Sequence, residues 1–496
     1  MRRLGLLTAF LLLGATSSIK VDMVAAILPP PTEPGKAVLP YVNVPAGKIA
    51  LVHARIIDGT GAPPMEDRTL LIDSGRIAAI QPAGDPLPAG YRTIDARGRS
   101  VLPGWVGMHD HMYYATRPDL TAQMKWDPPL IIPEMAYSSP KMYLAAGVTT
   151  MRTTGAVEPS TDINIKRAID RGELVGPHMD VTGPYLEGAN SLFIQMQRLK
   201  SPGDARDTVA FWADQGVTSF KAYMNITRAE LKAAVDEAHR RGLKITGHLC
   251  AVTYPEAAAL GIDDLEHGFF ANTQLDPGKQ PDVCPESDGG PTLTTMTPGS
   301  AVGAALIKLL VDRHVAVTST LPVFENDSST YALLPQRQLD LLTVEARTDY
   351  LYGFTRIARR PASMKAELAT LWTNDLAMER AFVAAGGLLL AGPDPTGDGH
   401  VLPGFGDQRE IELLVTAGFT PLEAIRIGTL NGAIYQGLDG RIGSIAVGKD
   451  ADLILVDGDP SKNISDIESV ATVFKDGVGY DPVALLASVR GRYGQY

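Results

Sequence analysis

The sequence predicts an α/β protein, a (β/α)8 TIM-like barrel with a small β-sandwich domain formed from both chain ends. Between residues 101 and 430, short apolar strand-like segments alternate with helical segments. On both sides of this region, short alternating segments are separated by Gly, Pro and Asp turns, as in β-strands. The chain has 496 residues and is 45% hydrophobic, so it can bury a large core in more than one lobe.

The barrel is predicted because eight strand candidates are each followed by a helical stretch. The candidates are residues 101–109, 148–153, 178–183, 217–223, 243–248, 262–267, 315–320 and 387–392. In such a barrel the active site lies at the carboxyl-terminal ends of the strands. A doubly wound open sheet is the alternative, but no G-x-G-x-x-G or P-loop motif opens any of the helices, which disfavours it.

The clearest helix lies in TRAELKAAVDEAHRRG. Thr227 and Glu230 have the spacing of a capping box, an apolar stripe follows, and Gly242 ends the pattern. The small β domain is expected from residues 49–100 together with 431–480, and the barrel from residues 101–430. The proline-rich residues 27–48 predict an extended linker.

The N-terminal residues 1–26 predict a secretory signal peptide and the start of the mature chain. MRRLGLLTAFLLLGATSS begins with two arginines, continues with an apolar run and ends in small residues. The apolar run is too short for a stable membrane anchor. We therefore expect a secreted or periplasmic protein. The formal net charge of −11, without a basic run, argues against a nucleic-acid partner.

The segment GWVGMHDHMYY places two of the nine histidines of the chain one residue apart at the end of a strand. Alternate side chains of a strand share a face, so His109 and His111 point together and Asp110 points away. Two converging imidazoles indicate a metal site.

Four further side chains with metal-binding chemistry end other predicted strands. They are Lys221 in TSFKAY, His248 in KITGHL, His267 in DLEHG and Asp394 in LLLAGPD. In a barrel these strand ends lie together, so residues far apart in the sequence converge on one site.

These motifs resemble those of the amidohydrolase superfamily of metal-dependent hydrolases, most closely the imidazolonepropionase and Xaa-Pro dipeptidase-like branch. The resemblance covers roughly residues 48–480 and includes the closing segment GRIGSIAVGKDADLILVD. It implies two divalent metal ions bridged by a CO2-derived carbamate on Lys221. His109, His111 and Asp394 would hold one ion, and His248 and His267 the other. Nitrogen and carboxylate ligands favour zinc, with manganese, iron and cobalt as alternatives.

The implied activity is hydrolysis of an amide C–N bond by metal-activated hydroxide, with Asp394 as the catalytic proton carrier. The expected substrate is a small molecule such as a dipeptide or an N-acyl amino acid. A two-metal lactonase or a cyclic amidine deaminase is the alternative enzyme, and a catalytically silent barrel that acts as a binding protein is the non-enzyme alternative. The sequence leaves a homo-oligomer open.

Further roles are expected for residues near the strand ends. His178 is a candidate catalytic donor to the developing oxyanion. Tyr223, Tyr113 and His400 are candidates for substrate binding. Cys250 follows His248, and Cys284 lies in the polar loop after the sixth strand, so the two thiols either form a disulfide or remain free.

Overall fold

The computed structural model describes residues 34–115, 132–191, 193–396 and 400–494. The predicted signal peptide lies outside the described residues, as does the first part of the predicted linker. The later part of the linker forms the short helix η1 (Leu39–Tyr41) and the strand β1 (Val42–Val44).

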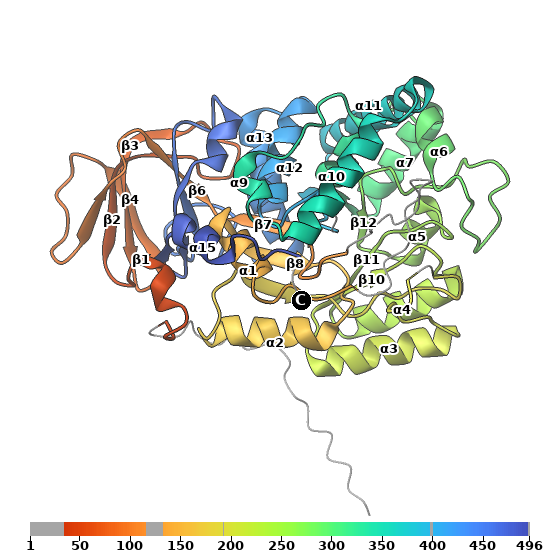
Figure 1. Ribbon diagram of the computed structural model, residues 1–496, viewed down its shortest axis with the longest axis horizontal. Helices are drawn as coiled ribbons and strands as arrows, with labels where there is room; N and C mark the ends of the chain where they lie inside the picture. The colour runs from red at the N-terminus through yellow and green to blue at the C-terminus, as the bar shows by residue number, and fades with distance from the viewer. Residues whose placement is uncertain (1–33, 116–131, 192, 397–399, 495–496) are drawn as a thin grey trace, which may run out of the picture.

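Strands from both ends of the chain form one mixed sheet at one end of the molecule (Figure 1). Besides β1, its strands in the described ranges are β2 (Ile49–Ile56), β3 (Met65–Asp73), β4 (Arg76–Pro82), β5 (Arg92–Asp95), β6 (Arg99–Pro103), β15 (Leu453–Asp457), β16 (Val470–Lys475) and β17 (Val478–Tyr480). The sheet order is β1-β17-β16-β15-β6-β2-β3-β4, and β5 pairs with β2. The antiparallel pairing of β15 with β6 joins the two chain ends.

The strands of this sheet share an apolar cluster. In β2 and β3, residues such as Leu51, Leu70 and Ile72 pack with Val101 and Leu453 in one apolar cluster. The hydrogen bonding joins the strands into a single sheet, so the two separate sheets of the expected sandwich are not seen.

The eight strands of the central region are parallel where they pair. They are β7 (Trp105–Asp110), β8 (Val148–Thr153), β9 (His178–Val181), β10 (Ser219–Ala222), β11 (Lys244–Gly247), β12 (Asp264–Glu266), β13 (Ala316–Ser319) and β14 (Leu389–Ala391). The first three form one sheet and the other five form another. Each overlaps one of the eight predicted strands.

Backbone contacts connect these two sheets at both seams. An isolated parallel bridge pairs Thr182 with Ser219, between β9 and β10. At the other seam, the Asp394 amide donates to the His109 carbonyl at 3.0 Å. The arrangement is TIM-barrel-like, although the described strands do not form one continuous hydrogen-bonded ring.

The first predicted strand, 101–109, is wrong in one respect, because it is two strands. β6 belongs to the small sheet and β7 to the central region, with Gly104 between them. A Cβ on Gly104 would lie 2.1 Å from the hydroxyl oxygen of Thr149, so the chain passes from one sheet to the other where no side chain fits.

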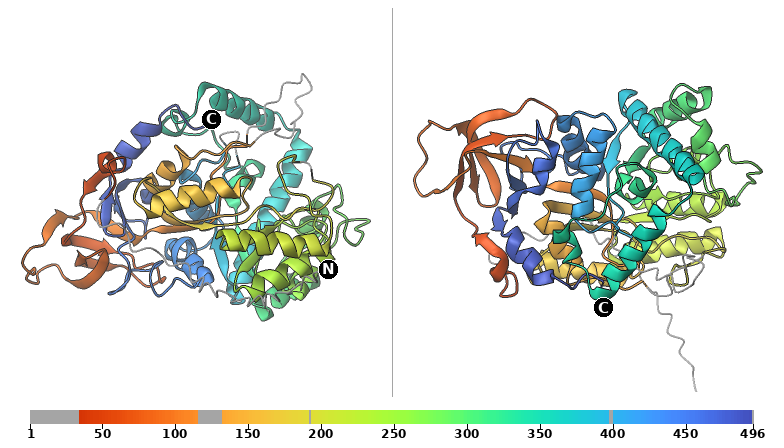
Figure 2. Two further views of the ribbon diagram at one scale, coloured as in Figure 1. Left: turned by 90° about the horizontal axis from the view of Figure 1, so that it is seen from below. Right: turned by 45° about the horizontal axis from the view of Figure 1, so that its top comes forward.

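Helices cover the outside of the central strands (Figure 2). They are α1 (Ser139–Ala145), α2 (Pro159–Asp170), α3 (Pro202–Gln215), α4 (Arg228–Arg240), α5 (Tyr254–Leu260), α6 (Gly290–Thr295), α7 (Ala301–Asp312), α8 (Leu321–Phe324), α9 (Gln336–Leu339), α10 (Val344–Ala358), α11 (Ala362–Ala384), α12 (Phe405–Thr416), α13 (Pro421–Arg426), α14 (Gly432–Gln436) and α15 (Pro482–Val489), with the short helices η2 (Glu325–Asp327), η3 (Ile427–Asn431) and η4 (Ile464–Glu468). α4 has the predicted capping box of Thr227 and Glu230. None of the helices in the described ranges has the length and apolar character needed to span a membrane.

Between β14 and β7, the close approach of the chain at Gly392 predicts that a side chain at this position would destabilise the fold. A Cβ there would lie 2.3 Å from the His109 backbone nitrogen and 2.4 Å from the His109 Cβ. We expect Gly392→Ala to lower the free energy of unfolding by about 1–3 kcal/mol, because the two strands would have to separate. Denaturant titration measures this change.

Gly84→Ala is the matched control, since a Cβ at Gly84 meets no atom within 4 Å. We expect this variant to stay within about 0.5 kcal/mol of the wild type. Equal stability of the two variants would contradict the close approach of the strands at Gly392.

Candidate metal centre

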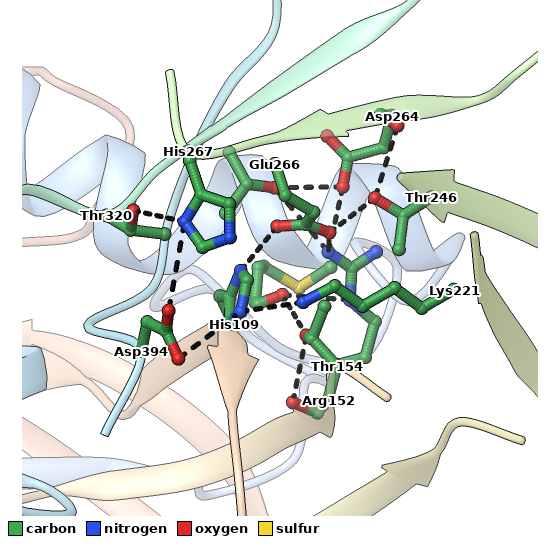
Figure 3. Close-up of polar contacts among 12 residues, drawn as sticks. His109, Arg152, Thr154, Lys221, Thr246, Asp264, Glu266, His267, Thr320 and Asp394 are labelled. Atoms are coloured by element: carbon green, nitrogen blue, oxygen red, sulfur yellow. Dashed lines mark hydrogen bonds and ion pairs between the residues drawn. The ribbon is translucent and has the colours of Figure 1, made fainter. Parts of the chain in front are cut away.

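Five strands bring the six predicted ligands to one end of the central region. Figure 3 shows four of them: His109, Lys221, His267 and Asp394. His109 lies in β7 and Lys221 in β10, while the other four follow directly or closely after strands. We call the six residues the ligand cluster: His109, His111, Lys221, His248, His267 and Asp394. All are buried except His248, which is partly exposed.

Short distances connect the members of the ligand cluster. Lys221 Nζ lies 3.1 Å from His109 Nε2. Asp394 Oδ1 lies 3.1 Å from His111 Nε2 and 3.6 Å from His109 Nε2. One ligand atom from each of His109, His267 and Asp394 fits within a group whose members are at most 4.8 Å apart. The His267 ring is centred 4.3 Å from the ring of His248. The segment directly after β11, which carries His248, therefore also reaches the cluster.

The orientation of His109 is fixed by a buried carboxylate. His109 Nδ1 lies 2.7 Å from Glu266 Oε2, so a proton on Nδ1 leaves Nε2 free to face the other ligands. Glu266 Oε1 accepts a hydrogen bond from Arg152 at 2.9 Å. Arg152 also donates to Asp264 at 2.8 Å and to the Met108 carbonyl at 2.8 Å.

Burial keeps the histidines of the cluster neutral. It is the main cause that lowers the pKa of His109, His111, His248 and His267, and the charge of Lys221 lowers each of them further. Burial also lowers the pKa of Lys221 to about 8, against the opposing effect of nearby carboxylates. The cluster therefore presents neutral imidazoles, the form that binds a metal ion.

Asp394 keeps its charge in these surroundings. Burial opposes its ionisation, but His109 and His111 hold the pKa of this carboxyl well below its ordinary value. The carboxylate is thus ionised at neutral pH and can bind a cation or accept a proton.

Two ligands occupy a backbone conformation that is uncommon outside glycine. His267 has φ 69° and Asp394 has φ 55°, both in the left-handed region. Such backbone strain is concentrated at functional sites, where the surrounding structure holds it in place.

The donor set fits a divalent metal ion. His267 Nδ1 lies 2.9 Å from the Thr320 hydroxyl, while its Nε2 is buried and has no hydrogen-bond partner among the described residues. A buried nitrogen without a partner is costly unless something else binds it. Neutral imidazoles with a carboxylate are ligands that zinc and related ions accept.

Three tyrosines stand beside the ligand cluster. Tyr113 stacks on the His111 ring at a centroid distance of 4.5 Å, and its hydroxyl lies 2.6 Å from that of Tyr185. Tyr223 contacts the rings of Tyr185 and His248, each at 4.9 Å. The structure places Tyr113 and Tyr223 beside the ligand cluster, and their contact with substrate stays a prediction.

A family model provides the decisive comparison. The model of the amidohydrolase family matches residues 100–275 and 401–479, just over half of the chain. This chain belongs to the amidohydrolase family. The predicted family resemblance is thereby confirmed, and members of this family use divalent metal ions.

Individual relatives agree with the family assignment. Imidazolonepropionase of Paenarthrobacter aurescens (strain TC1) is 33% identical over 105 residues, which cover 21% of this chain and 22% of that protein. This amidohydrolase chain thus spans about a fifth of the length of the curated relatives it matches.

Solved structures resemble the chain over most of its length. A Xaa-Pro dipeptidase with bound methionine has a TM-score of 0.64 and 20% identity, and the match covers 88% of this chain and 100% of that one. Aspergillus niger ochratoxinase has a TM-score of 0.61 and 17% identity, with 88% and 96% covered. These likenesses establish a TIM-barrel-like α/β fold for this amidohydrolase.

The structure does not bring His178 to the ligand cluster, so its predicted role as an oxyanion donor is wrong. His178 is the first residue of β9, and the ligands of this amidohydrolase lie at the opposite, carboxyl-terminal ends of the strands. His178 instead lies 3.3 Å from Asp476 and 3.7 Å from Asp452.

His400 lies against Tyr331. Its Nδ1 lies 2.7 Å from the Tyr331 hydroxyl, and the two rings stack at 4.8 Å. Burial, with the nearby charge of Arg360, lowers the pKa of His400 to about 4. The structure therefore gives His400 an aromatic partner, and its predicted contact with substrate stays a prediction.

Cys250 and Cys284 form a disulfide, which settles the alternative left open by the sequence. The bond ties the loop after β12 to the segment that follows His248. Thr273 of the same loop donates to the Cys250 carbonyl at 2.7 Å. The loop is thus fixed beside the ligand cluster.

Three residues of the site were not predicted. Glu266 directly precedes His267 in DLEHG, and a carboxylate beside a candidate ligand is the signal that could have found it. Tyr185 and Thr320 follow β9 and β13 in segments without a recognisable motif, and only the three-dimensional contacts identify them.

The contact between Glu266 and His109 predicts an effect on metal affinity. We expect Glu266→Gln to weaken zinc binding by about 10–100-fold, because a neutral amide no longer raises the basicity of His109. Competition with a chromogenic chelator measures the affinity. Glu173→Gln is the control, since Glu173 pairs with Arg171 on the surface. Unchanged affinity in Glu266→Gln would contradict the orienting role.

Proposed function

We propose that this protein is an exported binuclear metal-dependent hydrolase that cleaves an amide C–N bond of a small substrate, such as a dipeptide or an N-acyl amino acid. One observation carries the proposal. The buried Lys221 amine lies 3.1 Å from His109 Nε2, among neutral histidines from three other strand ends and Asp394 from a fourth. A lysine in this position suits a role as a ligand, which its ammonium form could not fill.

Lys221 acquires ligand character by carboxylation. Its neutral amine nitrogen would form a bond to the carbon of CO2 and lose one proton to water, which would leave an anionic carbamate with two oxygens. Because the surroundings lower the pKa of Lys221 to about 8, much more of it is neutral near pH 7–8 than of an exposed lysine. Each carbamate oxygen can face one metal ion.

The other ligands would divide between the two ions. His109, His111 and Asp394 would hold one, and His248 and His267 the other. Two such ions lower the pKa of a coordinated water and polarise the carbonyl of the substrate. Zinc is the ion we propose, because the donors are imidazole nitrogen and carboxylate oxygen without thiolate.

Asp394 carries the proton in the proposed reaction. Its carboxylate is ionised and would accept a proton from the attacking water. Giving that proton to the leaving nitrogen converts it into a neutral amine. His111 Nε2 lies 3.1 Å from this carboxylate, so the two groups can face the same ion.

Tyr113, Tyr185 and Tyr223 would bind the substrate beside the ions. Burial is the main cause that raises the pKa values of Tyr113 and Tyr185 well above the ordinary tyrosine value, so both phenols keep their protons. A tyrosine hydroxyl is an effective donor to a carbonyl oxygen. Because His178 lies at the other end of the strands, we favour the hydroxyls of Tyr113 and Tyr185 as donors to the carbonyl oxygen of the substrate.

The comparisons support an amide substrate. The Xaa-Pro dipeptidase structure resembles the chain over nearly all of its own length, and imidazolonepropionases resemble part of it. A lactone or a cyclic amidine is the second substrate class, since the same centre attacks carbonyl and amidine carbons.

Export is supported by the disulfide between Cys250 and Cys284. Disulfides persist in oxidising compartments such as the periplasm and are rare in the cytosol. We therefore propose a secreted or periplasmic location, in agreement with the N-terminal sequence pattern.

A substrate panel tests the proposed reaction. The zinc-loaded full chain is assayed against Xaa-Pro and other dipeptides, N-acyl amino acids, lactones and cyclic amidines, with release of amine, acid or ammonia as the readout. We expect turnover of dipeptides or N-acyl amino acids. Turnover confined to lactones or amidines would replace the amide proposal, and a chain that binds zinc without any turnover would favour the binding protein.

Lys221→Ala tests the bridging role. We expect the rate to fall at least about a hundredfold, equivalent to about 3 kcal/mol, because the two ions lose their shared ligand. Short carboxylic acids such as formate or propionate should restore part of the rate by occupying the space of the carbamate. Lys308→Ala is the control, since Lys308 pairs with Asp312 on the surface. Full activity of Lys221→Ala would refute the bridge.

A further inference from the structure

A second group of metal-binding side chains lies at the amino-terminal ends of the central strands. It consists of His178 at the start of β9, Asp452 just before β15 and Asp476 in the turn between β16 and β17. Because β9 belongs to the barrel-like region and the other two elements to the small sheet, these side chains meet where the two parts of the molecule join.

The spacing of the three side chains resembles that of ligands around one ion. His178 Nε2 lies 3.3 Å from Asp476 Oδ1 and 3.7 Å from Asp452 Oδ2. Charge-assisted N–H···O bonds are shorter, at about 2.7–2.9 Å. Tetrahedral zinc with bonds of about 2.0–2.1 Å separates its ligand atoms by about 3.3–3.4 Å.

Asp452 provides an independent indication that something is bound here. Its side chain is only 3% exposed, and Oδ2 has no hydrogen-bond partner among the described residues. The other oxygen accepts a hydrogen bond from the Asp476 amide at 2.7 Å, which holds the carboxylate in place.

A neighbouring lysine pairs with one of the proposed ligands, and its charge also acts on Asp452. Lys475 Nζ lies 3.6 Å from Asp476 Oδ2, the oxygen on the side away from the His178 contact. Although burial opposes ionisation, His178 and Lys475 hold the pKa of Asp476 below its ordinary value. One oxygen of Asp476 thus faces the lysine, and the other faces His178.

Two cavities give access to the group. One of about 310 Å³ is lined by His178 and Asp452, and another of about 260 Å³ by Asp476 and Lys475. Water from either cavity can complete a four-coordinate site, because a metal ion with three protein ligands takes its fourth from solvent.

We propose that His178, Asp452 and Asp476 bind one divalent transition-metal ion, with zinc as the best match, and that this ion links the barrel-like region to the small sheet. The site is separate from the ligand cluster and independent of the proposed reaction. Its ligands come from three elements distant in the sequence, so binding the ion stabilises the contact between the two parts.

Zinc stoichiometry tests the site. The full chain and its variants are dialysed against the same low concentration of free zinc, and bound zinc is measured by elemental mass spectrometry. We expect His178→Gln and Asp452→Asn each to bind one equivalent less than the wild type. They should also show a smaller zinc-induced rise in melting temperature. His239→Gln is the matched control, because His239 also faces an aspartate, Asp263, but on the surface.

Diffraction from zinc-grown crystals of the wild type provides a second measurement that does not depend on a variant folding. We expect an anomalous peak within about 2.0–2.2 Å of the three ligand atoms. No peak there, or equal zinc content in His178→Gln and the wild type, would overturn the proposal and leave a histidine with two carboxylates as an ion-paired contact only.

Discussion

The orientation of the ligand cluster depends on a buried network of charges that passes from Arg152 through Glu266 to His109. Barrel interiors are usually filled by branched apolar side chains, but here Arg152, Asp264 and Glu266 lie directly beneath the ligands. Glu266 and Asp264 hold the pKa of Arg152 above its ordinary value despite its burial. Loss of one partner would leave a buried charge uncompensated, at a cost of about 3–5 kcal/mol. The hydrogen bonds and ion pairs that orient His109 therefore also stabilise the buried core.

The same buried surroundings determine the charge of the candidate centre. Burial favours neutral imidazoles and a neutral Lys221, while Asp394 stays ionised between His109 and His111. Carboxylation of Lys221 would change its charge from positive or neutral to negative without adding a residue. In the proposed function, this one modification converts a group that repels cations into one that attracts them.

Much of the fold could be predicted because each strand of the central region is a short apolar run between turns or helices. The ligand positions followed from one rule, that residues at the ends of parallel strands meet. His178 shows the limit of that interpretation, because it starts its strand and therefore lies at the other end of the structure. The sequence also did not reveal that the chain passes from the small sheet to the central region at Gly104, because the apolar residues continue without a break from β6 into β7.

The contacts made by loops could not be predicted from the sequence. Tyr185 and Thr320 reach the centre from segments whose paths no periodicity fixes. Glu266 has a neighbour in the sequence, His267, that was recognised, yet its own partners, Arg152 and His109, come from other strands. The chemistry of the ligands is local and can be read from motifs, whereas the bonds that orient them depend on the folded structure.

The loop after β12 is attached covalently through Cys284 to Cys250, which lies two residues beyond His248. In a reducing environment the thiols would separate, while the histidines and Asp394, which are held by strands, would keep their positions. Selectivity for one molecule over another would then vary with the redox state of the surroundings, whereas the bond-breaking machinery itself would not.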